Sequence, residues 1–264
     1  MGSFRHRRRT VAVKDSGRMH TFDGIPTQTI NAAWPPASSG PSGAAAPPSP
    51  VARHIMELFA GGPLPEWDSF ARAIRLVRLR AGETLFDVGV QHPFIYVVRR
   101  GTIRVGFFDA SGKECLLAFC QPPDVLASVS AIAPAGVKRL AELPAGIVKV
   151  RAVGHLGHTA SRAVAVDYCE LERLDFRIME QLMKRHPAWA VAMFNAVTLH
   201  SLVKERRERE LLILTPEQRY RRFLEDYPDL MGVVSQKDIA SYLGVTPVGL
   251  SRIASRVRKD TAGG

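Results

Sequence analysis

Residues 236–255, with the sequence QKDIASYLGVTPVGLSRIAS, meet the physical requirements of two short helices that cross at a steep angle. Such a crossing needs an apolar contact face with one small residue, and it needs a turn that tolerates a positive φ. Ala240 is the small residue, and Gly244 supplies the turn. The apolar face consists of Ile239, Leu243, Val245, Leu250 and Ile253. The spacing therefore predicts a helix-turn-helix unit.

The sequence also indicates where both helices begin. Thr246 offers an N-cap hydroxyl, and Pro247 occupies the first helical position, where its missing N–H costs nothing. Ser235 followed by Asp238 resembles a capping box in which Asp replaces Glu. We therefore expect the first helix to start after Ser235 and the second after Thr246.

The face of the second helix that the crossing leaves uncovered is small and basic. Residues 236–259 carry five basic side chains and one acidic side chain, a balance that suits phosphate binding. Small residues let a helix approach a DNA groove, and an arginine can bond guanine O6 and N7 together. We expect DNA contacts from seven residues of this face: Val248, Gly249, Ser251, Arg252, Ser255, Arg256 and Lys259.

Within this face we assign base reading to Arg252, with Ser251 on a base edge or a phosphate. Arg256, Arg258 and Lys259 lie further along the helix, where contacts to phosphates position a protein without specifying sequence. The alternative is an ordinary helical hairpin with a solvated basic face.

Composition agrees with an anionic partner. The chain has 264 residues, a net charge of +11 and a pI near 10.1. Its length suits two modest domains and a tail. No apolar run approaches the roughly 20 residues that span a bilayer, so we expect no membrane partner. Cys115, Cys120 and Cys169 form no disulfide framework, which indicates a cytoplasmic location.

Residues 1–50 combine an Arg-rich start with a stretch rich in Pro, Ala, Ser and Gly. Such a composition buries too little apolar surface to offset the entropy of ordering, so we expect disorder. A nonspecific DNA arm, a transit-like signal and a solvated tail all remain open. No apolar segment follows the basic start, which excludes a secretory signal.

From residue 51 the pattern becomes regular. Residues 51–61 and 65–79 have apolar residues three and four apart and predict short helices. Short apolar runs punctuated by glycine follow, and they predict an antiparallel roll of the jelly type. Asp109 to Gly112 separates two such runs and predicts a hairpin loop with Gly112 in the αL conformation.

A long helix is expected over residues 186–213. Its apolar stripe is broader than one domain requires, which favours packing on its own roll and on a partner chain. A single buried helix is the alternative. The next helix starts with a capping box at Thr215, and its RYRRF run places three arginines where we expect phosphates. The apolar stripe of the long helix over residues 186–213 consists of Trp189, Met193, Val197, Leu199 and Leu202, extended by Ala190, Phe194 and Ala196.

These segments together resemble the Crp/Fnr family of transcription regulators over roughly residues 64–259, and the last 45 or so are the most specific. The resemblance implies an α+β chain with a cyclic-nucleotide-binding-like roll over 51–185, a dimerisation helix over 186–213 and a helix-turn-helix domain over 214–264. It also implies a homodimer on palindromic promoter DNA, with RNA polymerase and a small-molecule effector as further partners. The segments that carry it are AGETLFDVG, YVVRRGTIRV, DASGKECLLAF, CELERLD and LTPEQRYRRFLEDYP.

The chain departs from the family where cyclic AMP binds. The resemblance places a Gly-Glu pair for the ribose at Ala127 and Ser128, and an Arg-Ser pair for the phosphate at Thr159 and Ala160. Without that carboxylate and that guanidinium, the nucleotide loses its main charge-assisted hydrogen bonds. We therefore expect an effector other than cyclic AMP, and we leave its identity and any cofactor open.

The stretch between these positions, residues 132–158, reads as an insertion. His155 and His158 could join Cys169 or Cys115 at a metal, but solvated loop histidines are the plainer interpretation, and we expect no metal site. An iron–sulfur cluster is not expected, because the first 114 residues contain no cysteine. The insertion has four basic residues, which are Lys138, Arg139, Lys149 and Arg151. They could bind an anionic metabolite, but a solvated basic surface loop is the plainer interpretation.

A second departure lies in the recognition helix. Many members of the family carry Glu where this chain has Val248, so we expect an apolar contact here, such as one to a thymine methyl. The resemblance also implies a DNA-binding domain of winged-helix type, in which a β-hairpin wing follows the recognition helix in some members. The chain ends five residues after Lys259, so we expect this wing to be reduced.

Two other classes of function are alternatives to a transcription regulator. A sensing or scaffold roll whose C-terminal helices bind another protein would show weakly salt-dependent nucleic-acid binding. We expect no enzyme, because the sequence has no nucleophile elbow, phosphate loop, HExxH motif or paired acid and base.

Overall fold

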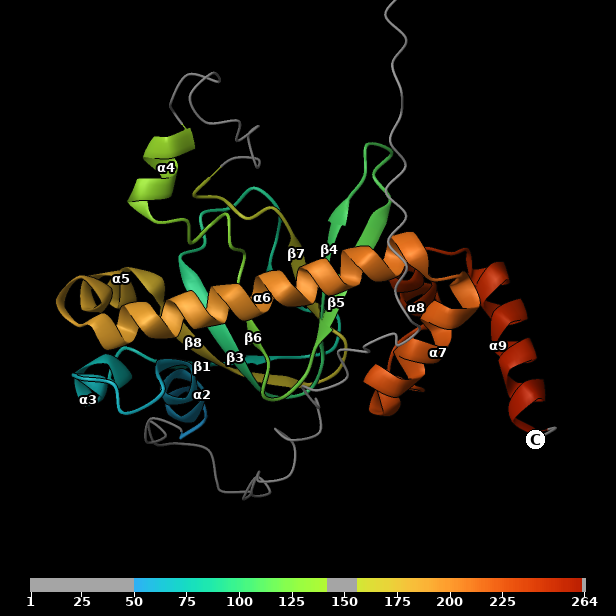
Figure 1. The fold of residues 1–264 in the computed structure, drawn as a ribbon, viewed down its shortest axis with the longest axis horizontal. Helices are drawn as coiled ribbons and strands as arrows, with labels where there is room; N and C mark the ends of the chain where they lie inside the picture. The colour runs from blue at the N-terminus through green and yellow to red at the C-terminus, as the bar shows by residue number, and fades with distance from the viewer. Residues whose placement is uncertain (1–49, 142–155, 263–264) are drawn as a thin grey trace, which may run out of the picture. The chain divides into compact units, whose positions relative to one another are not determined.

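The computed structural model describes residues 50–141 and 156–262, which belong to one compact unit (Figure 1). The tail predicted over residues 1–50 lies outside this range except for Pro50. Residues 142–155 of the predicted insertion also lie outside the described residues, and they include Lys149, Arg151 and His155.

Within the described residues, two helices precede the strands, another lies between the sixth and seventh strands, and the remaining helices follow the last strand. The first helices are α2 (Pro50–Ala60) and α3 (Trp67–Ala71). The strands are β1 (Arg75–Leu79), β2 (Thr84–Phe86), β3 (Phe94–Arg100), β4 (Ile103–Phe108), β5 (Glu114–Cys120), β6 (Val125–Leu126), β7 (Arg162–Ala165) and β8 (Cys169–Asp175). The other helices are α4 (Ala135–Ala141), α5 (Phe176–Arg185), α6 (Pro187–Ile213), α7 (Pro216–Asp226), the 3₁₀ turn η1 (Pro228–Leu230), α8 (Gln236–Leu243) and α9 (Pro247–Ala262).

The strands form two antiparallel four-stranded sheets, in the orders β1-β8-β3-β6 and β2-β7-β4-β5. Their facing sides share a buried apolar layer that includes Tyr96 and Val98 from the first sheet and Ile103 and Ala163 from the second. The β4–β5 loop closes with Gly112 at φ +79°, as predicted. The α+β fold with a jelly-type roll is therefore confirmed.

The helix predicted over residues 65–79 is wrong in its second half. Only Trp67–Ala71 is helical, and RLVRL forms β1, which pairs with β8 through Val77 and Leu171. Val77 and Leu79 alternate with residues on the other face, and both pack against the layer between the sheets. The spacing of Leu76, Val77 and Leu79 is compatible with the helical period of about 3.6 residues and with the strand period of two. Pairing with β8 decides in favour of the strand.

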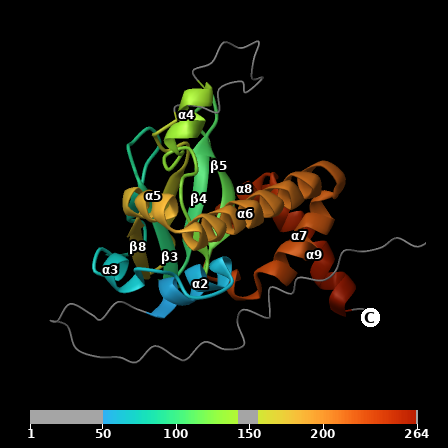
Figure 2. The same cartoon turned by 60° about the vertical axis from the view of Figure 1, so that its left-hand side comes forward.

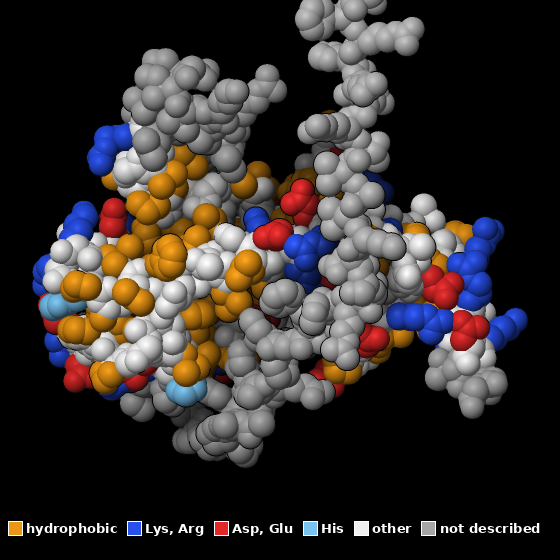
Figure 3. Space-filling model, in the orientation of Figure 1, with side chains coloured by type: hydrophobic (Ala, Val, Ile, Leu, Met, Phe, Trp, Pro, Cys, Tyr) orange, Lys and Arg blue, Asp and Glu red, His pale blue; other side chains and the backbone are white. Residues whose placement is uncertain are grey.

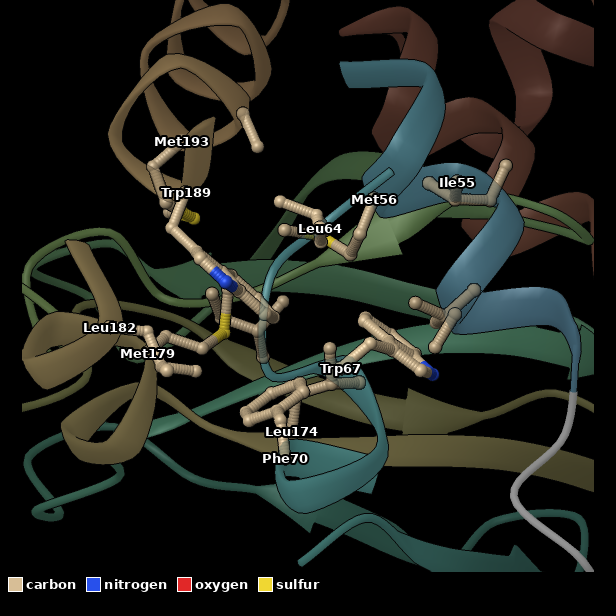
Figure 4. Close-up of a cluster of buried hydrophobic side chains, with 14 of the residues drawn as sticks. Ile55, Met56, Leu64, Trp67, Phe70, Leu174, Met179, Leu182, Trp189 and Met193 are labelled. Carbon is tan, nitrogen blue, oxygen red and sulfur yellow. The ribbon is translucent and has the colours of Figure 1, made fainter. Parts of the chain in front are cut away.

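Helices cover the outer side of the first sheet (Figure 2). Trp189 of α6 is fully buried there, stacked on Trp67 at 5.9 Å and edge-on to Phe70 at 4.9 Å between ring centroids (Figure 4). Its indole Nε1 donates to the Pro65 carbonyl at 2.9 Å, so the one polar atom of the ring is satisfied. This contact anchors the start of α6 to the roll.

The long helix α6 has two apolar faces, as the sequence predicts. Trp189, Ala192 and Met193 are buried against the roll. A second set of apolar residues on α6 is exposed, and hydrophobic side chains gather along this helix on the face shown in Figure 3. The side away from the buried residues carries Val191, Phe194, Val197 and Leu202, and we call these four the outer α6 face. Phe194 is the most exposed of the four at 70%. Leu199 and Val203 are exposed further along the side of Ala192.

The roll and the C-terminal helices share one buried cluster. Leu116 and Phe119 of β5 pack together with Phe223 of α7 and Tyr242 of α8. The ring of Phe119 lies 5.4 Å from that of Tyr242 and 6.2 Å from that of Phe223. Gly106 of β4 lets Leu116 take its place, because a Cβ there would stand 2.9 Å from Leu116 Cδ2. The helix-turn-helix thus completes its core with residues of the roll.

We predict that Phe119→Ala lowers the free energy of unfolding by about 3–5 kcal/mol, because it empties a buried ring site between two elements. The same change should speed amide hydrogen exchange in α8, since Tyr242 loses a packing partner. Phe108→Ala, on the exposed end of β4, is the matched control and should do neither. Equal exchange of α8 in the two variants would contradict the shared core.

Candidate nucleic-acid interface

The turn between α8 and α9 has the geometry that the sequence predicts. Gly244 ends α8 at φ 68° and ψ 36°, in the left-handed region that a Cβ disfavours. Thr246 Oγ1 accepts a hydrogen bond from the Gly249 amide at 3.1 Å, as an N-cap does. Pro247 is the first residue of α9.

The crossing face is buried as expected. Ile239, Leu243 and Leu250 are fully buried, and Ala240 and Ile253 are buried beside them. Val245, in the turn, is half-buried and packs against the same cluster. Burial of this face fixes α9 relative to α8, so that the opposite side of α9 points away from the core.

The seven residues predicted to contact DNA lie on that opposite side. Val248 is 63% exposed, and Gly249 is half-buried against Thr246. The other five are exposed: Ser251, Arg252, Ser255, Arg256 and Lys259. Arg252 makes no ion pair within the described part of the chain, so its guanidinium is available. Their role in DNA binding stays a prediction.

A hollow of about 740 Å³ lies between the start of α7 and α9. The confirmed capping box of α7 forms one wall, with Thr215 Oγ1 accepting from the Gln218 amide at 3.3 Å. Glu217 in the same wall pairs with Arg256 at 3.4 Å, so one predicted phosphate contact is tied to α7 here. The hollow is lined by Thr215, Pro216, Glu217, Val245, Thr246, Gly249, Arg252, Ile253 and Arg256.

The three arginines of the RYRRF run, which the sequence places where we expect phosphates, all have partners within the described residues. Arg219 donates to the carbonyls of Leu243 at 3.0 Å and Leu214 at 2.8 Å. Arg221 and Arg222 pair with acidic side chains of α6, α7 and α9, which are Glu210, Glu217, Glu225 and Asp260. The two pairs within α7 follow the i,i+3 and i,i+4 spacing of the sequence. The carbonyls, Glu210 and Asp260 come from other elements, so spacing does not reveal them.

Arg219 therefore has a structural role. It joins the end of α6 to the end of α8, where helix carbonyls lack intrahelical partners. Burial lowers the pKa of its guanidinium, and the nearby charge of Arg207 lowers it further. Arg207 lies over the Tyr242 ring at 3.9 Å and donates to the Tyr242 carbonyl. Sequence reasoning missed both residues.

The capping box expected at Ser235 is only half present. Ser235 accepts from the Asp238 amide at 3.1 Å, which confirms the N-cap. The Asp238 carboxylate instead faces the roll, 3.9 Å from Arg104 of β4, which also pairs with Glu114 at 2.7 Å. A capping box normally has Glu or Gln at this position, and the side chain of Asp is shorter. Here the Asp238 carboxylate lies near Arg104 of the roll, and within the described residues it makes no bond to the Ser235 amide.

Ser241 provides a second link that the sequence does not indicate. Its hydroxyl accepts from the Leu116 amide at 3.1 Å and donates to the Glu114 carbonyl at 3.2 Å. Since β5 is the edge strand of its sheet, α8 satisfies backbone groups that would otherwise lack a strand partner.

The positions that the resemblance assigns to the nucleotide are engaged with the roll itself. Ser128 Oγ accepts from the Ala160 amide at 3.1 Å and lies 3.1 Å from Ser130 Oγ. Thr159 Oγ1 accepts from the Val90 amide at 3.1 Å and donates to the Asp87 carbonyl. Ser128 and Thr159 are both buried, so these hydroxyls serve the fold.

Among the described residues no group of three or more His, Cys, Asp or Glu side chains is placed to hold a metal ion. Of the described helices, none combines the length and the apolar character needed to cross a bilayer. Helix α9 continues to Ala262, the last described residue, and between α7 and α8 the structure has an isolated bridge, Met231 to Val234.

Solved structures identify the fold. The chain is similar to FixK2 from Bradyrhizobium japonicum at 17% identity, covering 71% of this chain and 86% of that chain, with a TM-score of 0.55. It is similar to the c-di-GMP responsive regulator CLP of Xanthomonas campestris at 14% identity, 74% and 91% coverage and a TM-score of 0.54. A CooA mutant from Carboxydothermus hydrogenoformans matches at 16% identity, 71% and 78% coverage and a TM-score of 0.50.

These three proteins are Crp/Fnr regulators, so the chain has the Crp/Fnr-type fold of a roll followed by a helix-turn-helix. No family model matches the sequence, and no curated protein matches it. At these identities the likeness concerns the fold.

We predict that Arg219→Gln lowers the free energy of unfolding by about 2 kcal/mol, because charge-assisted bonds to helix-end carbonyls are lost. The measurement is urea unfolding followed by circular dichroism. Arg252→Gln, on the exposed side of α9, should leave stability within about 0.5 kcal/mol of the native value. Equal stability of the two variants would contradict the structural role of Arg219.

Proposed function

We propose that this chain is a sequence-specific DNA-binding transcription regulator of the Crp/Fnr type, acting as a homodimer on a palindromic promoter site. One observation supports this most: a capped and buried α8–α9 crossing presents an exposed side that carries small and basic residues. RNA polymerase is the further partner that a promoter-bound regulator implies.

On DNA, Arg252 takes the role of base reader and bonds a guanine O6 and N7. Val248 meets a thymine methyl, since its exposed side chain carries no polar atom. Lys259 and Arg256 contact phosphates and add salt dependence without adding specificity. For Arg256 this requires release of Glu217, its partner in the free protein.

The outer α6 face supports the homodimer. Phe194 and Leu202 are exposed by 70% and 54%, on a helix whose other face is already buried in the roll. A contiguous exposed apolar surface of this kind indicates a protein interface. Two copies of α6 that pack through this face would bury it and pair two recognition helices, which matches a two-fold DNA site.

The effector we propose is not cyclic AMP. Ser128 and Thr159 replace the residues that hold ribose and phosphate in the family, and both hydroxyls bond the roll itself. The described part of the roll offers no carboxylate or arginine at these four positions, which are 127, 128, 159 and 160.

The test is in vitro selection of duplexes from a random pool with the native chain and with Arg252→Ala. The native chain should enrich a palindrome, and the variant should lose enrichment because the loss of a bidentate pair costs about 1–3 kcal/mol of discrimination. Lys259→Ala is the matched control, and it should keep the palindrome with weaker, less salt-dependent binding. A pool without any motif for the native chain, bound equally by all three, would refute sequence-specific recognition.

The dimer has its own test. We predict that Phe194→Glu yields a monomer in sedimentation velocity, because a charge at the centre of the outer α6 face would have to be buried without a partner. Leu58→Glu, on the exposed side of α2, is the control and should remain dimeric. A dimer that persists in Phe194→Glu would place the interface elsewhere.

A further inference from the structure

A small hollow of about 240 Å³ opens on the roll, far in sequence from the helix-turn-helix. It is formed by the ends of β1, β3 and β8 and by the first turn of α5. Three of its lining residues are apolar and three are charged. They are Ala73, Phe94 and Ile178, and Arg75, Arg173 and Asp175.

The strand register brings two arginines together in this hollow. Arg75 and Arg173 are directly opposite each other in the β1–β8 pair. Like charges at directly opposed positions destabilise a sheet. Val77 and Leu79 of β1, on the same side as Arg75, pack in the layer between the sheets, so the arginine pair lies at the open end of that layer.

Neither arginine makes an ion pair within the described residues, although Asp175 lies close enough to Arg173 for their charges to interact. Arg75 Nη1 donates to the carbonyls of Arg72 at 2.7 Å and Ile74 at 3.0 Å, which carry no net charge. Arg173 is half-buried, lies 4.4 Å from the centroid of the Phe94 ring and, within the described residues, makes no ion pair. A half-buried guanidinium without a direct ion pair is uncommon, because burial penalises its charge.

The one carboxylate in the hollow is already committed. Asp175 receives bonds from Arg177 Nε at 2.9 Å and Nη2 at 2.6 Å, and it caps α5 through the Arg177 amide at 2.9 Å. Hydrogen bonds from Arg177 hold the pKa of this carboxyl below its usual range, and the nearby charge of Arg173 lowers it further. Three guanidinium groups thus surround one carboxylate, and the local charge is positive.

The positive charge of Arg173 affects the neighbouring residue His92. His92 lies 5.3 Å from Phe94 between ring centroids, and Tyr96 Oη lies 2.8 Å from His92 Nε2. Burial lowers the pKa of His92, and the charge of Arg173 lowers it further. A neutral imidazole and a ring face leave the arginine pair as the dominant charge at this end of the roll.

We propose that this hollow binds a small organic anion that carries a carboxylate or phosphate on a flat apolar body. Arg75 and Arg173 both line the hollow and can bond the oxygens of such a group, and Phe94 with Ile178 gives its apolar body a contact surface. The hollow is smaller than the roughly 300–1,000 Å³ of drug-sized sites, which favours a compact metabolite. The site involves no residue of α8 or α9 and does not depend on DNA binding.

The test uses the full chain labelled with ¹⁵N-arginine, titrated with benzoate, phenyl phosphate and neutral benzamide at constant ionic strength. The Arg173 side-chain resonance should shift saturably with at least one of the two anions and not with benzamide. Which anion binds more tightly decides between carboxylate and phosphate.

Arg173→Gln should weaken the anion's affinity at least about tenfold, because a charge-assisted pair is lost, and Arg75→Gln should weaken it as well. Arg78→Gln is the matched control on β1, since Arg78 pairs with Glu170 at 3.3 Å outside the hollow, and it should bind as the native chain does. Thermal unfolding checks that each variant is folded.

Two results would overturn the proposal. One is a linear, unsaturated response of all arginines to both anions, which is general ion screening. The other is saturable binding of an acidic peptide at Arg173 with neither small anion bound, which would make the hollow a protein contact.

Discussion

The contact between β5 and α8 is the interaction on which the described structure most depends. An edge strand leaves backbone groups without partners, and an isolated helical hairpin of this length has a small core. Ser241 satisfies the edge at Leu116 and Glu114, while Phe119 fills the cluster of the C-terminal helices. Each part covers what the other lacks, which is why both belong to one compact unit.

Charge in the C-terminal region divides into structural and available groups. Arg207 and Arg219 hold helix ends together through carbonyl bonds, and Arg221 bridges Glu217 and Asp260. Arg252 stays free of ion pairs within the described residues. The net charge of +11 belongs to the whole chain, and several basic side chains of this region are already bonded within the protein. Fewer basic residues are therefore free to contact DNA phosphates than the sequence indicates.

Local features could be predicted from the sequence because they depend on neighbours along the chain. Gly244, Thr246 and the buried spacing around Leu250 follow from backbone conformation and helical period. Contacts between distant elements could not be predicted, as Arg219 and Ser241 show, since their partners are backbone atoms that any residue provides. The strand at Arg75–Leu79 was mistaken for a helix because only its pairing with β8 decides the period.

Hydroxyl-radical footprinting on a selected duplex tests the central claim most directly, because it reports both the reading surface and the two-fold assembly. A homodimer that reads DNA through two copies of α9 should protect two half-sites centred about one helical turn, roughly 10 base pairs, apart. A single protected stretch, or uniform weak protection that disappears with salt, would contradict the account of a dimeric sequence-specific regulator.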